Sequence, residues 1–248
     1  MKFSEFKYER PNFDQYKATM TSLIDQFKVA SSASEQLNIV TEINETRNHI
    51  ETMATLASIR HSIDTRDEFY DAEQNYWDEY GPLYEEINSL FYDAVVSSPY
   101  RNELEEKLSK QFFTILDYRL KAFSPEIIAD LQEENKLSSQ YTKLLASAKI
   151  PFDGEERTLP GMGKYLLSED RTVREAASKA KYAFFEEHEA EIDEIYDQLV
   201  KVRTRIAKKL GFNNFVELGY VRMTRSDYNP EMVENFRKQV LDYIVPVA

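Results

Sequence analysis

The sequence contains no cysteine and little glycine or proline. Of its 248 residues, 6 are glycine and 8 are proline. The absence of cysteine excludes disulfides, thiolate nucleophiles and cysteine-based metal sites. All-β folds need many turns and usually contain more glycine and proline, so this composition favours long helices.

Basic residues and long apolar runs are also scarce. Lys and Arg number 31 against 44 Asp and Glu, a net charge of −13. An acidic surface repels phosphate backbones and anionic lipids, so we expect neither nucleic acid nor membrane as a partner. No window approaches the ~20 apolar residues of a membrane span. Residues 1–5 lack the apolar core of a signal peptide, and we therefore expect a cytoplasmic protein.

Amphipathic segments with recognisable start signals fill the first part of the chain. Apolar residues recur at three- and four-residue steps, which predicts helices with one buried face. Gly81-Pro82 is expected to kink or split the third helix. Short connections predict an all-α fold that begins with an antiparallel helical bundle. The start signals are Pro11-Asn12, Ser32 with Glu35, Thr65 with Glu68, Ser98-Pro99 and Ser124-Pro125.

The stretch from Ile150 to Gly163 interrupts this pattern and contains half of the glycine. It predicts a small hairpin or ordered loop and a boundary between two domains, residues 1–149 and 150–248. A long helix is expected over residues 168–209, with Gly211 beyond its end. A short helix capped by Asn213 or Asn214 follows, and a last helix should run from Asn229-Pro230 to Ile244.

The three histidines do not form a metal site by spacing. The zinc-peptidase signature places two histidines one helical turn apart, with glutamate after the first. The nearest approach, His188-Glu-Ala-Glu-Ile192, has isoleucine where the second histidine must stand. A di-iron bundle needs glutamate three residues before histidine, and Thr46, Ser58 and Phe185 occupy those positions. We therefore expect no metal and no catalytic residue in this chain.

Two other features allow alternative interpretations. An aromatic run, which comprises Tyr70, Tyr76, Trp77, Tyr80 and Tyr84, predicts either helix-packing core or a peptide-binding surface. Arginine and tyrosine alternate over residues 219–228, at the junction of two predicted helices. That segment could hold a carboxylate or a peptide carbonyl, or its arginines could simply cap helix ends.

The residues from 199 onward carry a family resemblance. Leu199 to Tyr220 reads LVKVRTRIAKKLGFNNFVELGY, and Arg222-Met223 and Arg225-Ser-Asp-Tyr228 follow. This pattern closely resembles the zinc oligopeptidases of the oligoendopeptidase F type, within the thimet oligopeptidase-like family. Upstream, Phe152-Asp-Gly-Glu155 with Thr158-Leu159, and Asp170-Arg171 with Arg174, match as well. The resemblance covers the whole chain and is most specific over residues 152–245.

The resemblance implies the amino-terminal half of a longer zinc metalloendopeptidase that hydrolyses oligopeptides. In that family the His-Glu-x-x-His helix and a glutamate ligand lie in the carboxy-terminal half, and a zinc-activated water attacks with glutamate as general base. The present residues would form a wall of the substrate cleft, bind no zinc and be inactive alone. Tyr220, Arg222 and Tyr228 are the expected substrate contacts.

Two alternatives accompany that hypothesis. The chain could be a complete, non-catalytic helical binding or regulatory protein derived from such a peptidase. It could also be one part of a nicked enzyme whose other half stays associated. If part of a larger core is absent, an apolar face near the carboxy-terminal helices should be exposed and promote association.

Overall fold

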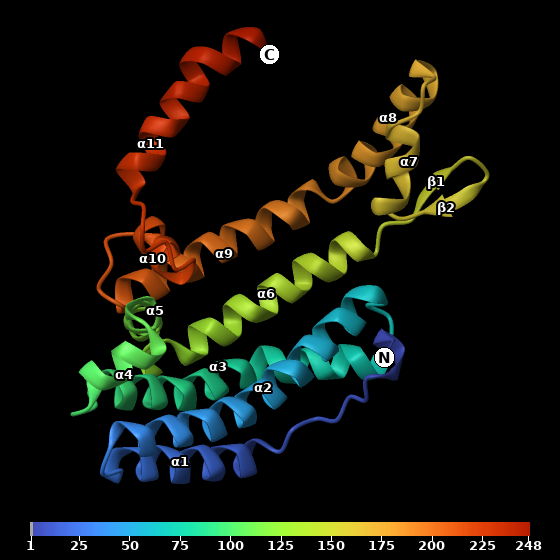
Figure 1. The fold of residues 1–248 in the computed structure, drawn as a ribbon. Helices are drawn as coiled ribbons and strands as arrows, with labels where there is room; N and C mark the ends of the chain where they lie inside the picture. The colour runs from blue at the N-terminus through green and yellow to red at the C-terminus, as the bar shows by residue number, and fades with distance from the viewer. Residues whose placement is uncertain (1) are drawn as a thin grey trace. The chain divides into compact units, whose positions relative to one another are not determined.

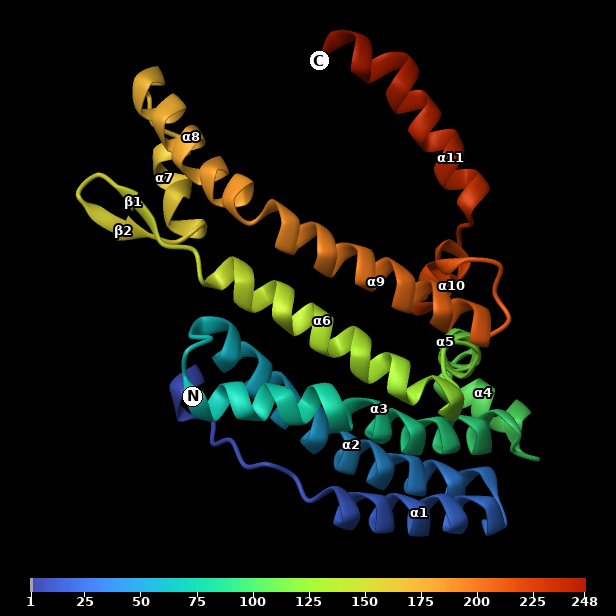
Figure 2. The same ribbon diagram turned by 180° about the vertical axis from the view of Figure 1, so that it is seen from behind.

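The computed structural model describes residues 2–248, which are mostly helical, as predicted (Figures 1 and 2). No helix in this part of the chain has the length and apolar character needed to cross a membrane. The α-helices are α1 (Phe13–Val29), α2 (Ala33–Ile63), α3 (Glu68–Val96), α4 (Arg101–Leu108), α5 (Lys110–Lys121), α6 (Ile128–Ala146), α7 (Gly163–Leu166), α8 (Arg171–Glu187), α9 (Glu189–Lys209), α10 (Phe215–Arg222) and α11 (Pro230–Gln239). Short 3₁₀ turns and a π-helix complete the helical elements: η1 (Phe3–Glu5), η2 (Pro125–Ile127), η3 (Pro160–Met162), η4 (Val240–Ile244, the π-helix) and η5 (Val245–Val247).

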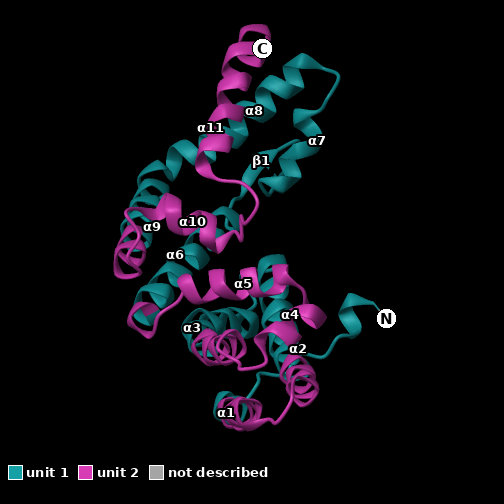
Figure 3. Cartoon of the chain, turned by 60° about the vertical axis from the view of Figure 1, so that its left-hand side comes forward, with its two compact units in different colours: residues 1–16, 45–84, 128–203 teal, residues 17–44, 85–127, 204–248 magenta. Residues whose placement is uncertain are grey.

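The chain divides into two compact units, coloured separately in Figure 3. Unit 1 comprises residues 1–16, 45–84 and 128–203, and therefore includes α6, α7, α8 and the hairpin. Unit 2 comprises residues 17–44, 85–127 and 204–248, and includes α4, α5, α10 and α11. Four of the five boundaries fall inside α1, α2, α3 and α9, so each of these helices contributes residues to both units, and the fifth lies between η2 and α6.

In unit 1 the aromatic run of α3 forms packing contacts. The rings of Tyr76 and Tyr80 stack with centroids 4.4 Å apart, and Trp77 lies 5.4 Å from the largely buried Tyr84. The hydroxyls of Tyr76 and Tyr84 are 3.1 Å apart, and the Trp77 indole donates to the Tyr8 hydroxyl at 3.2 Å. These contacts favour the packing interpretation of this run.

A buried carboxylate joins α3 to the amino-terminal segment. Glu73 accepts hydrogen bonds from the Arg10 guanidinium at 2.6 and 2.9 Å and from the Tyr8 hydroxyl. Burial opposes the ionisation of Glu73, but the hydrogen bonds from Arg10 and Tyr8 and the charge of Arg10 outweigh burial and lower its pKa. Burial, followed by the hydrogen bond to Glu73, raises the pKa of Tyr8. Glu73 is therefore a charged anchor for residues 8–10.

Helix α3 is continuous through Pro82, so of the two predicted effects, a kink or a split, the split does not occur. Proline lacks the N–H that would bond to the carbonyl four residues earlier, that of Asp78. The side-chain amide of Asn135, on α6, donates to that carbonyl at 3.1 Å. Gln132 donates in the same way to the carbonyl of Glu79 at 2.8 Å. Two amides of α6 thus supply donors where the proline disturbs the helix.

The segment after α6 forms the predicted hairpin. Strands β1 (Ile150–Phe152) and β2 (Glu155–Arg157) pair antiparallel, with Ile150 opposite Arg157. Asp153 and Gly154 both have positive φ, 54° and 73°, which is the requirement of a two-residue type I′ turn. The hairpin and the following turns cover a small apolar cluster that includes Ala148, Ile150, Met162, Ala177 and Phe184.

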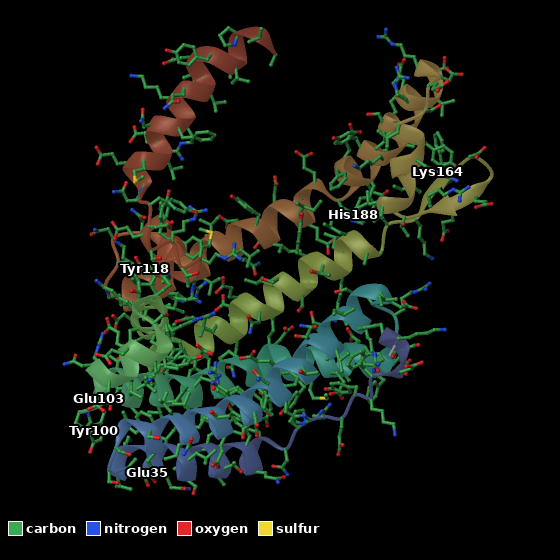
Figure 4. All side chains as sticks on the ribbon, in the orientation of Figure 1. Glu35, Tyr100, Glu103, Tyr118, Lys164 and His188 are labelled. Carbon is green, nitrogen blue, oxygen red and sulfur yellow. The ribbon has the colours of Figure 1, made fainter. Side chains whose placement is uncertain are left out.

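In unit 2 a buried glutamine connects the ends of two helices. Gln36, only 1% exposed, donates to the carbonyl of Phe27 at 3.0 Å and accepts from the Ser98 hydroxyl at 2.6 Å. Tyr100, labelled in Figure 4, donates to the carbonyl of Ser31 at 2.6 Å. The carbonyls near the end of α1 lack intrahelical donors, and these side chains satisfy them.

The predicted helix starts are correct in part. The Ser32 hydroxyl accepts from the Glu35 N–H at 3.2 Å, although the Glu35 carboxylate accepts from Ser31 rather than from Ser32. Asp67, and not Thr65, caps α3, because its carboxylate accepts from the N–H groups of residues 69 and 70. Aspartate is a stronger N-cap than threonine and stands one residue before the helix begins.

Two predicted helices are interrupted. Residues 101–121 form α4 and α5, which are separated by Ser109 with φ 86° and ψ 152°. The long helix expected over residues 168–209 is α8 and α9, separated at His188 with φ −104° and ψ 12° (labelled in Figure 4). Neither position carries glycine or proline, so the composition gave no signal for a break. The last α-helix ends at Gln239, and the π-helix η4 continues to the predicted end at Ile244.

Candidate substrate-contacting segment

One glycine with positive φ and two asparagine N-caps define the segment between α9 and α11. Gly211 adopts φ 82° just after α9, a left-handed conformation that suits glycine at a helix end. The Asn214 side chain then caps α10 by accepting from the N–H groups of Val216 and Glu217. Asn229 caps α11 by accepting from the Met232 N–H at 2.9 Å. The sequence therefore fixes both ends of the segment through short-range hydrogen bonds.

Two of the predicted substrate contacts lie together around an arginine. The Arg225 guanidinium is 4.5 Å from the ring centroid of Tyr220 and 5.4 Å from that of Tyr228. The two rings meet edge to face, with centroids 6.3 Å apart. Tyr228 is 39% exposed, so the cluster borders solvent. The N–H groups of a guanidinium lie in its own plane, so a guanidinium packed on an aromatic face can still donate them at its edge to a carboxylate or carbonyl.

Contacts with α5 hold the backbone of this cluster. The Tyr118 hydroxyl, labelled in Figure 4, donates to the carbonyl of Arg225 at 3.4 Å. The Gln111 amide donates to the Ser226 hydroxyl at 3.0 Å. Within the segment, the Arg225 N–H donates to the carbonyl of Tyr220 at 3.1 Å. The loop is therefore fixed by side chains more than a hundred residues away in sequence, which no local pattern predicts.

Arg222, the third predicted contact, occupies a different position. Its guanidinium lies 5.7 Å from the ring of Phe215, at the other end of α10. Sequence reasoning selected Arg222 and left out Arg225, although both stand in the quoted segment. Both arginines stand between Tyr220 and Tyr228 in the sequence, so their spacing does not distinguish them. In the structure it is Arg225, just after Thr224 with its φ of 50°, that contacts both rings.

The described histidines lie apart and in different settings. His49 is exposed, His61 is 2% exposed and faces Asp71, and the Nδ1 of His188 is 3.4 Å from the Glu191 carboxylate. No group of three or more His, Cys, Asp or Glu side chains within residues 2–248 is arranged to hold a metal ion. These residues do not fit a zinc site, so no catalytic step is assigned to them.

The chain is similar to known peptidases over its whole length. Residues 3–123 match the family model described as the Peptidase M3 N-terminal domain. A solved structure of Pz peptidase A with an inhibitor superposes on 99% of the chain with TM-score 0.96 and 55% identity. A protein assigned as oligoendopeptidase F from Bacillus anthracis str. Ames superposes on 100% of it with TM-score 0.96 and 52% identity. No curated protein matches the chain significantly.

The helical architecture and these matches define a domain of the M3 peptidase class. The chain belongs to the M3 peptidase family and is of the oligoendopeptidase F type, to which the resemblance over residues 199–228 pointed. It covers 44% of the Pz peptidase A chain and 45% of the Bacillus anthracis chain, so it spans less than half the length of these relatives.

Proposed function

We propose that this chain is the amino-terminal portion of a cytoplasmic zinc metalloendopeptidase that hydrolyses short peptides. The observation that carries the proposal is the match over 99–100% of the chain, at 52–55% identity, to peptidases of this family. At that level of identity the relatives' helices and the loops between them are expected to be shared, including the segment that bears Tyr220, Arg222 and Tyr228.

The portion would contribute one wall of the substrate cleft. Tyr220, Arg222 and Tyr228 are proposed to contact the peptide, and Arg225 joins them because it lies between the two tyrosines. Guanidinium groups suit the carbonyls and the terminal carboxylate of an oligopeptide, and tyrosine rings add apolar contact area. Pre-ordered side chains lose little entropy on binding, which favours such contacts.

Zinc is proposed as the cofactor of the whole enzyme, with its ligands outside these 248 residues. The described part of the chain has no cluster of three or more His, Cys, Asp or Glu side chains that could hold a metal ion. This portion is therefore proposed to be inactive alone. Cleavage of a fluorogenic oligopeptide by the 248-residue chain, lost with a chelator and restored with zinc, would contradict that proposal.

Reading the gene beyond the codon for Ala248 tests the proposal directly. An open frame that encodes His-Glu-x-x-His supports the peptidase. An immediate stop codon instead supports the alternative of a non-catalytic helical binding protein derived from such a peptidase.

Substitution tests the proposed peptide contacts in the full-length enzyme. Arg222→Ala and Tyr228→Ala should raise KM for oligopeptides or lower kcat/KM, whereas Glu186→Gln, an exposed change on α8, should leave both unchanged. Unaltered peptide kinetics in both test variants would exclude the assigned role.

The apolar face of α11 and the π-helix is proposed to pack against the rest of the peptidase. Its large side chains are strongly exposed here, including Met232 at 56%, Phe236 at 64% and Leu241 at 62%. Met232, Phe236 and Val240 recur every four residues, as expected of a buried helix face. In a protein of the relatives' length, the residues that follow could cover this face.

A further inference from the structure

A polar seam in unit 1 occupies positions where helices normally bury apolar residues. Helices α2, α3 and α6 line a cavity of about 250 Å³. The residues from α6 follow the i, i+3, i+4, i+7 spacing of a core-facing stripe, yet all of them are polar. The nine lining residues are Ser58, His61 and Ser62 from α2, Gln74 and Asp78 from α3, and Asn135, Ser138, Ser139 and Thr142 from α6.

Asp78 is the charged group of this cavity. It is only 4% exposed, and its Oδ1 accepts from the Gln74 amide at 2.8 Å. Its Oδ2 is buried and accepts no hydrogen bond from any donor in residues 2–248. A carboxylate oxygen without a partner is costly in a protein interior. Asp78 therefore has one strong acceptor site that the protein itself does not use.

The neighbouring carboxylate is already compensated. Asp71 pairs with the Lys143 ammonium, and its Oδ1 is 3.3 Å from the Nε2 of His61. Hydrogen bonding by Lys143 is the largest cause that lowers the pKa of Asp71, ahead of the opposing effect of burial. None of the nine side chains that line the cavity is lysine or arginine. The uncompensated negative charge of the cavity is thus that of Asp78.

Three of the five hydroxyl groups that line the cavity, those of Ser62, Ser138 and Thr142, donate their protons to main-chain carbonyls. The Ser62 hydroxyl donates to the carbonyl of Ser58 at 2.8 Å, and that of Ser138 donates to the main-chain carbonyl of Glu134 at 2.9 Å. Thr142 donates to the carbonyl of Ser138 at 3.1 Å. Each hydroxyl has one proton, so these three oxygens retain only lone pairs for a ligand.

We propose that this cavity binds a small organic cation with a primary ammonium group, held by Asp78 Oδ2 and the hydroxyl oxygens of Ser62, Ser138 and Thr142. An ammonium group has a positive charge and three N–H donors, which match one carboxylate surrounded by acceptors. The volume exceeds what a single inorganic ion needs and suits an ammonium with a short carbon chain. The site is independent of the proposed peptidase function.

Binding of three probes to the full chain tests the proposal by titration calorimetry. Butylamine carries both charge and N–H donors, 1-butanol has the same shape without charge, and tetramethylammonium has charge without donors. We expect saturable binding of one butylamine per chain and no binding of the other two. Equal binding of 1-butanol and butylamine, or no binding of butylamine, would overturn the proposal.

Asp78→Asn is the decisive variant, because it keeps the shape and the acceptor for Gln74 while replacing Oδ2 with a donor. Loss of the charge-assisted hydrogen bond should weaken butylamine binding by roughly tenfold or more. Asp25→Asn, an exposed carboxylate on α1, changes the net charge equally and should leave the affinity unchanged. Equal weakening by both variants would show that net charge, rather than the cavity, attracts the amine and would overturn the site.

A milder variant covers the case in which Asp78→Asn does not fold. Thr142→Val is nearly isosteric and removes one acceptor, so we expect butylamine to bind several-fold more weakly, with the circular dichroism spectrum unchanged. An unchanged affinity in folded Thr142→Val would contradict the assigned contact.

Discussion

The side-chain amide of Asn135 donates to the main-chain carbonyl of Asp78 at 3.1 Å, in the place of the N–H that Pro82 lacks. Proline inside a helix costs about 3 kcal/mol or more, partly through the carbonyl that it leaves unpaired. A donor from α6 removes that part of the cost. The same contact fixes α6 against α3 on the side where Asp78 faces the polar cavity.

Asn135→Leu should therefore destabilise the protein. The Asp78 carbonyl would lose its donor, and the free energy of unfolding should fall by about 1–3 kcal/mol in urea titrations. In a Pro82→Ala background the helix can supply its own N–H, so the effect of Asn135→Leu should be smaller by about 1 kcal/mol or more. Lys136→Leu, an exposed change on the same helix, should stay within about 0.5 kcal/mol of wild type. If the effects of Asn135→Leu and Pro82→Ala on the free energy of unfolding are additive, the Asn135 amide does not take the place of the N–H that Pro82 lacks.

The helix periodicity was enough to predict the fold class and most helices, whereas α3 shows why the rest was missed. Gly81-Pro82 carries a local signal for a break, and a side chain more than fifty residues later in the sequence overrides it. Ser109 and His188 interrupt helices without any local signal. Propensity describes a segment by itself, and at Pro82 a contact with a distant residue decides the outcome.

The buried Glu73 should make stability depend on acidic pH. The pKa of Glu73 is lower in the folded protein than in the unfolded chain, and so is that of Asp71 beside Lys143. The stabilisation is therefore fully present above the unfolded glutamate pKa of about 4.3, and it is lost as pH falls through the folded pKa values. Glu73→Gln should lower the free energy of unfolding by about 1–3 kcal/mol at neutral pH, because Arg10 loses its charged partner. The loss stays in this range because Arg10 is half exposed and water can solvate its guanidinium. The variant should also lose less stability than wild type between neutral pH and about pH 3.5.

Glu186→Gln provides the matched control for charge, since that carboxylate is exposed on α8. In urea titrations at the two pH values, the free energy of unfolding of the control variant should fall by the same amount as that of wild type. If Glu73→Gln unfolds with the same pH dependence as wild type, the carboxylate of Glu73 is not the group responsible.

Ser109 gives a prediction in which two effects have opposite signs. Its φ of 86° and ψ of 152° lie in a region that is essentially restricted to glycine and costs roughly 1–3 kcal/mol for other residues. Its hydroxyl also caps α5 by accepting from the Phe112 N–H at 3.3 Å. Ser109→Gly should raise stability by about 1 kcal/mol, because glycine removes the strain and costs only a few tenths as an N-cap. Ser109→Ala keeps the strain and loses the cap, so it should lower stability by about 1 kcal/mol.

Thermal unfolding of the two variants checks this assignment. Gly211→Ala is the converse control, since φ at Gly211 is 82° and a side chain there introduces strain. It should lower the midpoint temperature. A lower midpoint for Ser109→Gly than for Ser109→Ala would show that the cap outweighs the backbone conformation.

Sequence reasoning found the candidate segment but not its central residue. The alternation of arginine and tyrosine over residues 219–228 identified the segment, and Tyr220 and Tyr228 do lie together. Which arginine lies between them depends on the turn at Thr224 and on the hydrogen bond from Tyr118 to the Arg225 carbonyl. The first is a backbone conformation at a non-glycine residue and the second is a long-range contact, so the spacing of residues alone could not separate Arg222 from Arg225.

The exposed face of α11 and the π-helix gives the last prediction, on association of the 248-residue chain. Contiguous apolar side chains of this size promote association in water, so the chain studied alone should form dimers or larger species at micromolar concentration. Phe236→Glu should shift sedimentation toward the monomer, because a charge cannot be buried in such a contact without a partner. Gln239→Glu adds the same charge beside the face and should shift the distribution much less. If both variants sediment like wild type, another surface drives the association. If Phe236→Glu alone is monomeric, the same substitution in a protein of the relatives' length should lower thermal stability, because there the face would be buried.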